Sequence, residues 1–144
     1  MQLKFKKLNN SVITPKYHTE GSAGFDLHSL ETKSLEPNEI YLFSTGIFIE
    51  VPEGYEAQVR PRSGLATKNG ITVINTPGTV DSDYRGEVKV ALINLGKKEI
   101  LIHKDDRIAQ VIISPIIQCE LIETDELSNT DRNQNGFGST GKYR

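Results

Sequence analysis

The apolar residues of this 144-residue chain fall into many short runs, and turn-forming residues separate them. Tyr55, Ala57 and Val59 alternate with polar residues, which is the period of a strand with one buried face. Turn signals such as Pro52-Glu53-Gly54 recur at a spacing of roughly 8–12 residues, which is typical of β-sandwiches and β-barrels. A helical turn or two is expected only over residues 64–69, and the βαβ alternation of a parallel sheet is missing. We therefore predict an all-β domain of short strands.

Charge and cysteine content exclude several classes of protein. The chain has 17 basic and 19 acidic residues, so its net charge of −2 offers no general attraction for nucleic acid. No apolar run approaches the roughly 20 residues that span a bilayer, and the N-terminus lacks the apolar stretch of a secretory signal. The single cysteine, Cys119, excludes an internal disulfide and a zinc site of several thiolates. We expect a cytoplasmic protein with neither nucleic acid nor a membrane as its partner.

The character of the chain changes at Thr124, after which it is polar and rich in glycine. We predict a β domain over residues 1–123 and a flexible C-terminal arm over residues 124–144. The arm segment GFGSTGK matches G-x-G-x-x-G and nearly matches a P-loop. Both patterns need a strand before them and a helix after them, and the chain ends three residues after Gly141. We reject both interpretations.

Two interpretations of the arm remain. Its composition favours a mobile tail. Alternatively, it closes over an anion, because successive glycine N–H groups can surround a phosphate. Ser139 and Thr140 would add hydroxyl donors, Arg132 a charge, and Phe137 a ring that stacks on a flat ligand. These four features together favour the closing phosphate clamp.

The segment RPRSGLA places two arginines, a hydroxyl and a glycine at the start of the expected helical turn. Arg62, Ser63 and Gly64 are suited to binding phosphate. Taken alone, however, this segment is more often a solvated loop with a structural arginine.

The segment GTVDSDYRGEV has the D-x-D spacing of a calcium loop, but Arg85 and Leu92 stand where oxygen ligands are required. An ordinary turn is one alternative, since aspartate, serine and glycine favour turns. The functional alternative is an acidic base, Asp81, beside an aromatic platform, Tyr84. Asp81 follows an apolar strand, so it could point into a pocket.

Three polar residues interrupt apolar strands. Asp26 either caps a turn or pairs with an arginine, because an unpaired buried carboxylate is costly. The alternative is a water-mediated contact to Mg²⁺, which keeps several waters and uses few carboxylates. Arg107 and Gln110 break a later strand and are more often structural than catalytic in such a position. The three histidines are scattered without metal-ligand spacing.

The segments AGFDLHS, PRSGLA, GTVDSDYRGEV, RIAQVII and NGFGSTG occur in this order between about residues 22 and 141. Each is weak alone, but together they resemble the five motifs of the trimeric dUTP diphosphatases (dUTPases). The resemblance implies a distorted jelly-roll β-barrel with a flexible C-terminal arm, assembled as a homotrimer with shared active sites. It also implies Mg²⁺-dependent hydrolysis of dUTP to dUMP and pyrophosphate, which removes dUTP and supplies dUMP for dTTP synthesis.

The same resemblance implies roles for single residues. Asp81 matches the general base that directs water onto the α-phosphorus, and Tyr84 matches the residue under the deoxyribose that excludes a 2′-hydroxyl. Asn75 matches the amide that contacts uracil, with backbone groups of a 75–81 hairpin, including Thr79 and Val80, completing that recognition.

The remaining roles implied by the resemblance concern phosphates, metal and arm. Asp26 matches an acid linked to magnesium through water, while the role of Arg107 stays open between a core ion pair and a site organiser. The other implied substrate contacts, from a neighbouring subunit, from the core strands and from the arm, are Arg62, Ser63, Gly64, Lys89, Gln110, Arg132, Phe137, Gly138, Ser139 and Thr140. Within the arm, Arg132 and the two hydroxyls would bind the γ-phosphate while Phe137 stacks over uracil.

Two rival functions are weighed against this resemblance. A dCTP deaminase of the same superfamily would use a glutamate base in a different motif, and the Asp81-to-Tyr84 spacing favours dUTPase. Zinc-dependent deamination needs H-x-E and P-C-x-x-C, which one cysteine cannot supply. A non-catalytic binding protein would have no reason to keep Arg62, Asp81, Tyr84 and Phe137 together.

Overall fold

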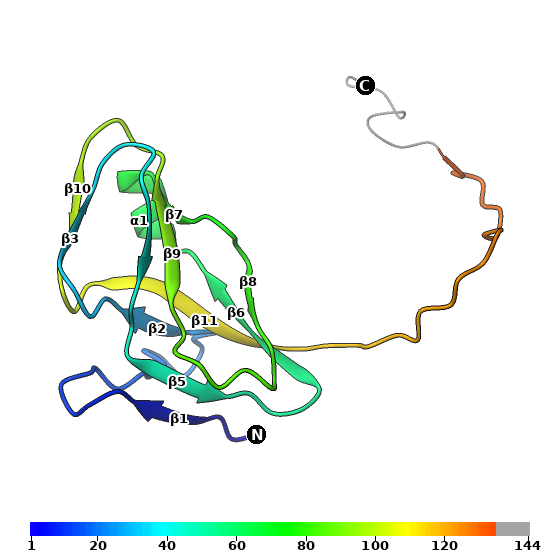
Figure 1. Cartoon of the computed structure of the whole chain (residues 1–144), viewed down its shortest axis with the longest axis horizontal. Coiled ribbons are helices and arrows are strands. Elements are labelled where there is room, and N and C mark those ends of the chain that lie inside the picture. Colours follow the sequence, from blue (N-terminus) through cyan, green and yellow to red (C-terminus); the bar gives the residue numbers. More distant parts are fainter. Residues whose placement is uncertain (135–144) are drawn as a thin grey trace.

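Two antiparallel sheets carry most strands of the computed structural model, which describes residues 1–134 (Figure 1). The four-stranded sheet has the order β2 (Phe25–His28), β11 (Arg107–Pro115), β6 (Tyr55–Arg60) and β8 (Gly78–Val80). The three-stranded sheet has the order β4 (Ile40–Phe43), β9 (Val90–Asn94) and β7 (Ile71–Val73). Two ribbons pair β1 (Lys4–Lys7) with β5 (Ile47–Glu50) and β3 (Lys33–Leu35) with β10 (Ile100–Ile102). The predicted all-β fold is confirmed.

Alternation in the sequence decides which side chains form the core. In β6, Ala57 and Val59 are buried while Gln58 points outward, as the period of two predicts. A single cluster of buried side chains, supplied by both sheets and by both ribbons, fills the interior. Close packing of these β-branched and aliphatic groups makes each strand a rigid support for the polar residues at its ends.

The one helix of the described chain is α1 (Ser63–Asn69), where the sequence predicts a helical turn or two. It ends at Gly70, whose φ of +72° is left-handed, and Gly70 donates its N–H to the carbonyl of Ala66. A Cβ at Gly70 would lie 2.7 Å from the backbone nitrogen of Gly96. The sequence therefore needs glycine there both for the backbone conformation and for the close approach of a neighbouring loop.

The expected hairpin over residues 75–81 is wrong. β7 pairs with β9 in the three-stranded sheet, whereas β8 pairs with β6 in the four-stranded sheet. The segment between them crosses from one sheet to the other and includes Pro77, which has no N–H for a ladder. Asn75 and Asp81 therefore lie on either side of β8 and are not paired across a turn.

The described chain beyond β11 leaves the sheets. Ile116 still donates its N–H to the carbonyl of Gly54, but residues 117–134 form no helix or strand and are exposed (Figure 1). No helix within residues 1–134 is long and apolar enough to cross a membrane. The boundary predicted at residue 124 falls inside this exposed segment.

Candidate active site

A cationic hollow of about 310 Å³ lies where β2, β11 and the start of α1 meet. Arginine, histidine and amide side chains surround one buried carboxylate there. The lining residues are His18, Ser22, Ala23, Gly24, Asp26, Arg62, Ser63, Gly64, Arg107 and Gln110. Six of the sequence-predicted residues from three segments, Asp26, Arg62, Ser63, Gly64, Arg107 and Gln110, are thus brought together.

The buried carboxylate of Asp26 is the centre of this cluster. Its Oδ1 lies 3.1 Å from Nε of Arg62, and its Oδ2 lies 2.9 Å from Nε2 of His18 and 3.4 Å from Nη1 of Arg107. The Asp26 side chain is only 11% exposed, so these partners offset a large desolvation penalty. Of the alternatives for Asp26, pairing with arginine is therefore present in the structure.

Strand register explains this convergence. On the central strand β11, Gln110 is the register partner of Asp26 on β2 and of Arg60 on β6, so these positions share one face of the sheet. A β-bulge shifts the register between Arg107 and Ala109. An extra residue in a strand redirects its neighbours, and here it places Arg107 beside Asp26. Arg107 is an ion-pair partner of the buried Asp26, but its own side chain is 45% exposed, so it lies at the mouth of the hollow and not in the core.

The charge of the hollow suits an anion. Arg62 gives Nε to Asp26 and Nη1 to the carbonyl of Arg107, at 3.1 and 3.3 Å. A guanidinium has five N–H donors, so three of them are left to bind a ligand. With Arg107 beside it, the cluster carries at least one net positive charge. Gln110 is held by donating Nε2 to the carbonyl of Pro61 at 3.0 Å.

His18 is the residue that sequence reasoning missed here. It stands eight residues before Asp26 and has no metal-ligand spacing, which is why the pattern of histidines gave no signal. The fold brings His18 to Asp26 because the ring of Tyr17 packs edge-on against the ring of Phe25, with centroids 5.8 Å apart. The neighbours of these two aromatic residues, His18 and Asp26, then meet.

His28, at the end of β2, belongs to the structural surroundings of the hollow and not to its lining. Burial lowers the pKa of His28 because desolvation disfavours the imidazolium, and this outweighs the opposing attraction of Asp26. His28 is the register partner of Arg107 across the β2–β11 pair. The lowered pKa disfavours a positive charge at this position, which would otherwise compete for the Asp26 carboxylate.

A second hollow, of about 280 Å³, lies at the far end of β8. It combines two carboxylates, one ammonium group and one aromatic ring with aliphatic walls. Its lining residues are Leu42, Thr79, Val80, Asp81, Tyr84, Glu87, Val88 and Lys89. The five sequence-predicted residues Thr79, Val80, Asp81, Tyr84 and Lys89 are thus together, and Glu87 was not predicted.

The Asp81 carboxylate differs from that of Asp26 in its surroundings. It is exposed, and within residues 1–134 no hydrogen bond or ion pair reaches it. Lys89 turns instead toward Glu87, with Nζ 3.8 Å from Oε2. An ionised carboxylate with free lone pairs can accept a proton from a bound water, whereas one held by two guanidinium groups and an imidazole is occupied.

The two hollows are separated within one chain and share no lining residue. β8 runs antiparallel to β6, so Asp81 lies beyond the Glu56 end of β6 while Arg62 follows Arg60 at the other end. The four residue steps from Glu56 to Arg60 correspond to about 13 Å of strand. Asn75 lies at the opposite end of β8 from Asp81 and does not line the Asp81 hollow.

The predicted contacts from the arm fall largely beyond the structure. Arg132 lies in the exposed segment that follows β11. Phe137, Gly138, Ser139 and Thr140 lie outside the described residues. Their predicted roles therefore stay predictions.

No cluster of three or more His, Cys, Asp or Glu side chains is placed to hold a metal ion among residues 1–134. Mg²⁺ prefers six oxygen ligands and often takes them from substrate phosphates and waters, with one or two carboxylates. The described residues fit Mg²⁺ as an ion carried by a polyphosphate, because Asp26, the one carboxylate of the cationic hollow, is already paired with Arg62 and Arg107.

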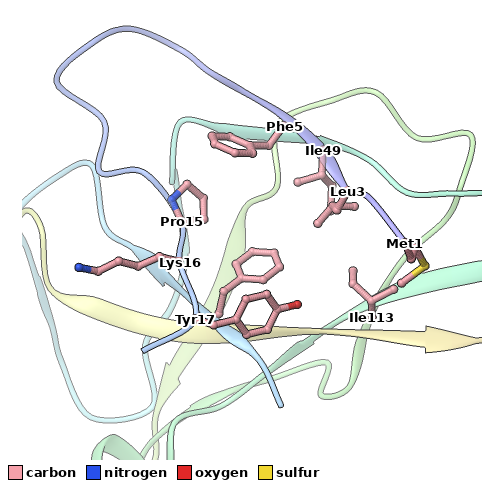
Figure 2. Close-up of a pocket in the computed structure, with 9 residues that line it drawn as sticks. Met1, Leu3, Phe5, Pro15, Lys16, Tyr17, Ile49 and Ile113 are labelled. Carbon is pink, nitrogen blue, oxygen red and sulfur yellow. The ribbon is translucent and has the colours of Figure 1, made fainter. Parts of the chain in front are cut away.

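A third hollow, of about 240 Å³, is apolar and lies between β1 and the loop that carries Tyr17 (Figure 2). Figure 2 shows the rings of Phe5 and Tyr17 and the aliphatic side chain of Ile113 around it. Its described lining has neither a carboxylate nor an arginine. Lys16 is the one charged side chain among its lining residues, so the hollow offers no carboxylate as a base and a single lysine ammonium group to a phosphate.

The fold and the two polar hollows fit a β domain that binds a phosphorylated nucleoside. A family profile described as dUTPase matches residues 10–141, and the chain belongs to the dUTPase family. The deoxyuridine 5'-triphosphate nucleotidohydrolase of Nautilia profundicola is 57% identical over 142 residues, covering 99% of this chain and 100% of the relative. The predicted family is confirmed.

Solved structures agree in fold. The dUTPase of Staphylococcus bacteriophage 80alpha, solved with dUpNHpp, has a TM-score of 0.87 at 28% identity and covers 98% of this chain and 99% of its own. A variant dUTPase from phage phi11 of S. aureus has a TM-score of 0.82 at 24% identity, covering 90% of this chain and 100% of its own. That second structure is described as showing a structural Mg(II) ion.

Proposed function

We propose that this protein is a dUTP diphosphatase, which hydrolyses dUTP to dUMP and pyrophosphate. Its family and its 57% identical relative support this activity over nearly the whole chain. The observation that carries the chemical proposal is the free Asp81 carboxylate beside Tyr84, at a distance from a separate cationic hollow. By this reaction the enzyme removes dUTP from the nucleotide pool and supplies dUMP for dTTP synthesis. We place it in the cytoplasm.

The cationic hollow would hold the phosphates. Arg62 offers its remaining N–H donors, and Ser63, Gly64 and Gln110 line the same hollow. Charge-assisted bonds from guanidinium to phosphate are about twice as strong as neutral ones. Because Asp26 holds Arg62 in place before substrate arrives, little reorganisation is needed when negative charge develops on the leaving pyrophosphate.

Asp81 would act as the general base. Its carboxylate takes a proton from a water molecule while that water's oxygen attacks the α-phosphorus. The new P–O bond forms as the bond to the bridging oxygen of pyrophosphate breaks, so the product is dUMP. The structural support is a carboxylate that has free lone pairs and lies in a hollow beside an aromatic ring.

The nucleoside would occupy the Asp81 hollow and the turn that leads into β8. Tyr84 offers a ring face for the deoxyribose, and Lys89 lies on the same wall. Asn75 would contact uracil from the other end of β8, where its amide nitrogen packs against Gly78. Backbone groups at Thr79 and Val80 lie between these two positions.

We propose that each site is shared between subunits of a homotrimer. A water that Asp81 deprotonates must lie at the α-phosphorus, while Arg62 of the same chain is on the order of 13 Å away along β6. One chain therefore cannot place both groups on one triphosphate. The cationic hollow of one subunit would instead face the Asp81 hollow of another.

Residues 124–144 would form the arm that closes this shared site. Support comes from the exposed course of residues 117–134 away from the sheets (Figure 1). Arg132, Ser139 and Thr140 would contact the γ-phosphate, and Phe137 would stack over uracil next to Gly138. Closure of such an arm excludes water other than the attacking molecule.

Magnesium is the proposed cofactor, with Asp26 contacting a water of its coordination shell. When bound to the triphosphate, the ion neutralises charge that develops on the phosphate oxygens. Replacing Asp26 with asparagine is expected to raise, by about tenfold, the Mg²⁺ concentration that half-saturates binding of a non-hydrolysable dUTP analogue. Calorimetric titration of the analogue at a series of Mg²⁺ concentrations measures this.

Glu20→Gln is the control, because it removes one negative charge from an exposed residue that does not line the hollow. Weaker binding in Asp26→Asn at every Mg²⁺ concentration, with the half-saturating concentration unchanged, would contradict the contact to magnesium. Asp26 would then serve only to hold Arg62 and Arg107.

The activity itself is tested by measuring pyrophosphate release with Mg²⁺ from dUTP, dTTP, dCTP and UTP offered separately. We expect release from dUTP, with the other three nucleotides slower by at least on the order of 100-fold. Conversion of dCTP to a uracil product would favour the deaminase alternative. No turnover of any nucleotide would leave a binding protein that has the fold of an enzyme.

A further inference from the structure

Gly86 is a glycine that the backbone does not require. Its φ is not left-handed, unlike that of Gly46, Gly54 and Gly70. The reason for glycine lies instead in its neighbour, because a Cβ at this position would overlap the hydroxyl and Cζ of Tyr84 and lie 2.9 Å from Cε2. The Tyr84 ring therefore occupies the space that a side chain at residue 86 would need.

The Tyr84 hydroxyl is held by the backbone of Glu87, the residue after Gly86. It donates to the backbone carbonyl of Glu87 at 3.0 Å. Tyr84 as a residue is 45% exposed and is therefore packed only partly by other side chains. Gly86 below the ring and the Glu87 carbonyl at its tip thus determine where the ring stands.

The Glu87 carbonyl is itself fixed by contacts to another strand. The Glu87 carboxylate accepts N–H groups from Thr45 and Gly46, at 3.0 and 2.7 Å. Its backbone forms an isolated bridge with Phe48 on β5. Gly46 has a φ of +68°, which directs its N–H into this contact without a side-chain penalty.

The loop before Gly86 is also braced. Tyr84 donates its N–H to the carbonyl of Asp81 at 3.2 Å, which closes a turn. The guanidinium of Arg85 donates to the carbonyls of Ser82 and Tyr84, at 2.6 and 2.9 Å. Both ends of the Tyr84 residue, its backbone and its hydroxyl, are therefore held before any ligand binds.

We propose that Gly86 and the Glu87 carbonyl form a seat that positions the Tyr84 ring, and that this seat sets the discrimination of the enzyme against a 2′-hydroxyl. This inference rests on the proposed function. An aromatic ring excludes one extra hydroxyl only if the ring cannot retreat, since displacement by little more than an oxygen radius would admit a ribonucleotide. Gly86 and Glu87 act through Tyr84 and are positioning residues.

The test compares Gly86→Ala with Gly21→Ala in the full-length enzyme. Nothing lies within 4 Å of a Cβ at Gly21, and its φ is not left-handed, so this control adds the same methyl group without a contact. In Gly86→Ala we expect the ratio of kcat/KM for dUTP over UTP to fall by at least about tenfold. Pyrophosphate release measures both rates, and the control should keep the wild-type ratio.

Glu87 provides a second, conservative pair. Glu87→Gln keeps an acceptor oxygen for Thr45 and Gly46 and should keep most of the selectivity. Glu87→Ala removes that oxygen and should lower the ratio in the direction of Gly86→Ala. A merely structural effect would lower kcat/KM for dUTP and for UTP by the same factor, so the ratio of the two values would stay unchanged.

Ring resonances of ¹³C-labelled tyrosine, with Tyr84 assigned by Tyr84→Phe, supply a readout that is independent of turnover. The Tyr84 resonance should shift in Gly86→Ala and stay in place in Gly21→Ala. An unchanged resonance, or a shifted resonance with an unchanged dUTP-to-UTP ratio, would overturn the proposal. Absence of dUTP turnover in the wild type would instead refute the proposed function and, with it, the claim of sugar selection.

Discussion

Replacing Asp81 with asparagine is expected to lower kcat for dUTP hydrolysis by on the order of 10³-fold or more. Asparagine has the same shape and still accepts a hydrogen bond from water, but its amide cannot take the proton. The affinity for a non-hydrolysable analogue should therefore stay within a few-fold of the wild-type value. Single-turnover pyrophosphate release and calorimetric binding measure the two quantities separately.

Asp83→Asn is the matched control for this variant. Asp83 is exposed in the same turn, two residues further along the chain, but it does not line the Asp81 hollow. The same charge is removed from the same loop, so an electrostatic effect at long range would appear in both variants. Undiminished kcat in Asp81→Asn would remove Asp81 as the base, and equal losses in the two variants would assign the effect to loop charge.

Local pattern was sufficient for much of the fold. The period of two in Tyr55–Arg60 predicted both the strand and its buried face, because alternation is a property of a few consecutive residues. The short helix was predictable for the same reason. The crossing between β7 and β8 was not, since it depends on which strand supplies each hydrogen-bond partner, and those partners are distant in sequence.

In the candidate site, too, some contacts could be predicted from the sequence and others could not. Residue types suggested that Asp26 needs an arginine partner, and it has two, Arg62 and Arg107. The bulge that redirects Arg107 has no signal in the sequence, because a bulge is defined by the register of two strands. His18 joins the cluster only through the packing of Tyr17 on Phe25.

Glu87 illustrates a further limit of sequence reasoning. A glutamate after a Tyr-Arg-Gly turn resembles any solvated surface residue. Its role becomes visible only when its carboxylate meets the N–H groups of Thr45 and Gly46, more than 40 residues earlier in the chain. Positioning residues of this kind act through contacts to backbone, and backbone groups carry no sequence signature.

Mixing two inactive variants is expected to restore activity. Arg62→Ala should lower kcat/KM by on the order of 100-fold or more, through loss of charge-assisted contacts to phosphate. Asp81→Asn lowers it through loss of the base. If each site takes Arg62 from one subunit and Asp81 from another, randomly assembled mixtures of the two variants contain an intact pair in roughly a quarter of their sites.

Co-expression of the two variants at equal levels, followed by a purification that does not select for subunit composition, gives the randomly assembled oligomers for this measurement. A second mixture, of wild type with the double variant, distinguishes the geometries. If the site is shared, this second mixture also contains an intact pair in roughly a quarter of its sites. If the site lies within one chain, roughly half of the sites in the second mixture are intact, and no site in the mixture of single variants is intact. Restoration in the single-variant mixture is the outcome that we expect from the separation of the two hollows along β6, because in the proposed shared site a second chain brings the base to phosphates held by Arg62.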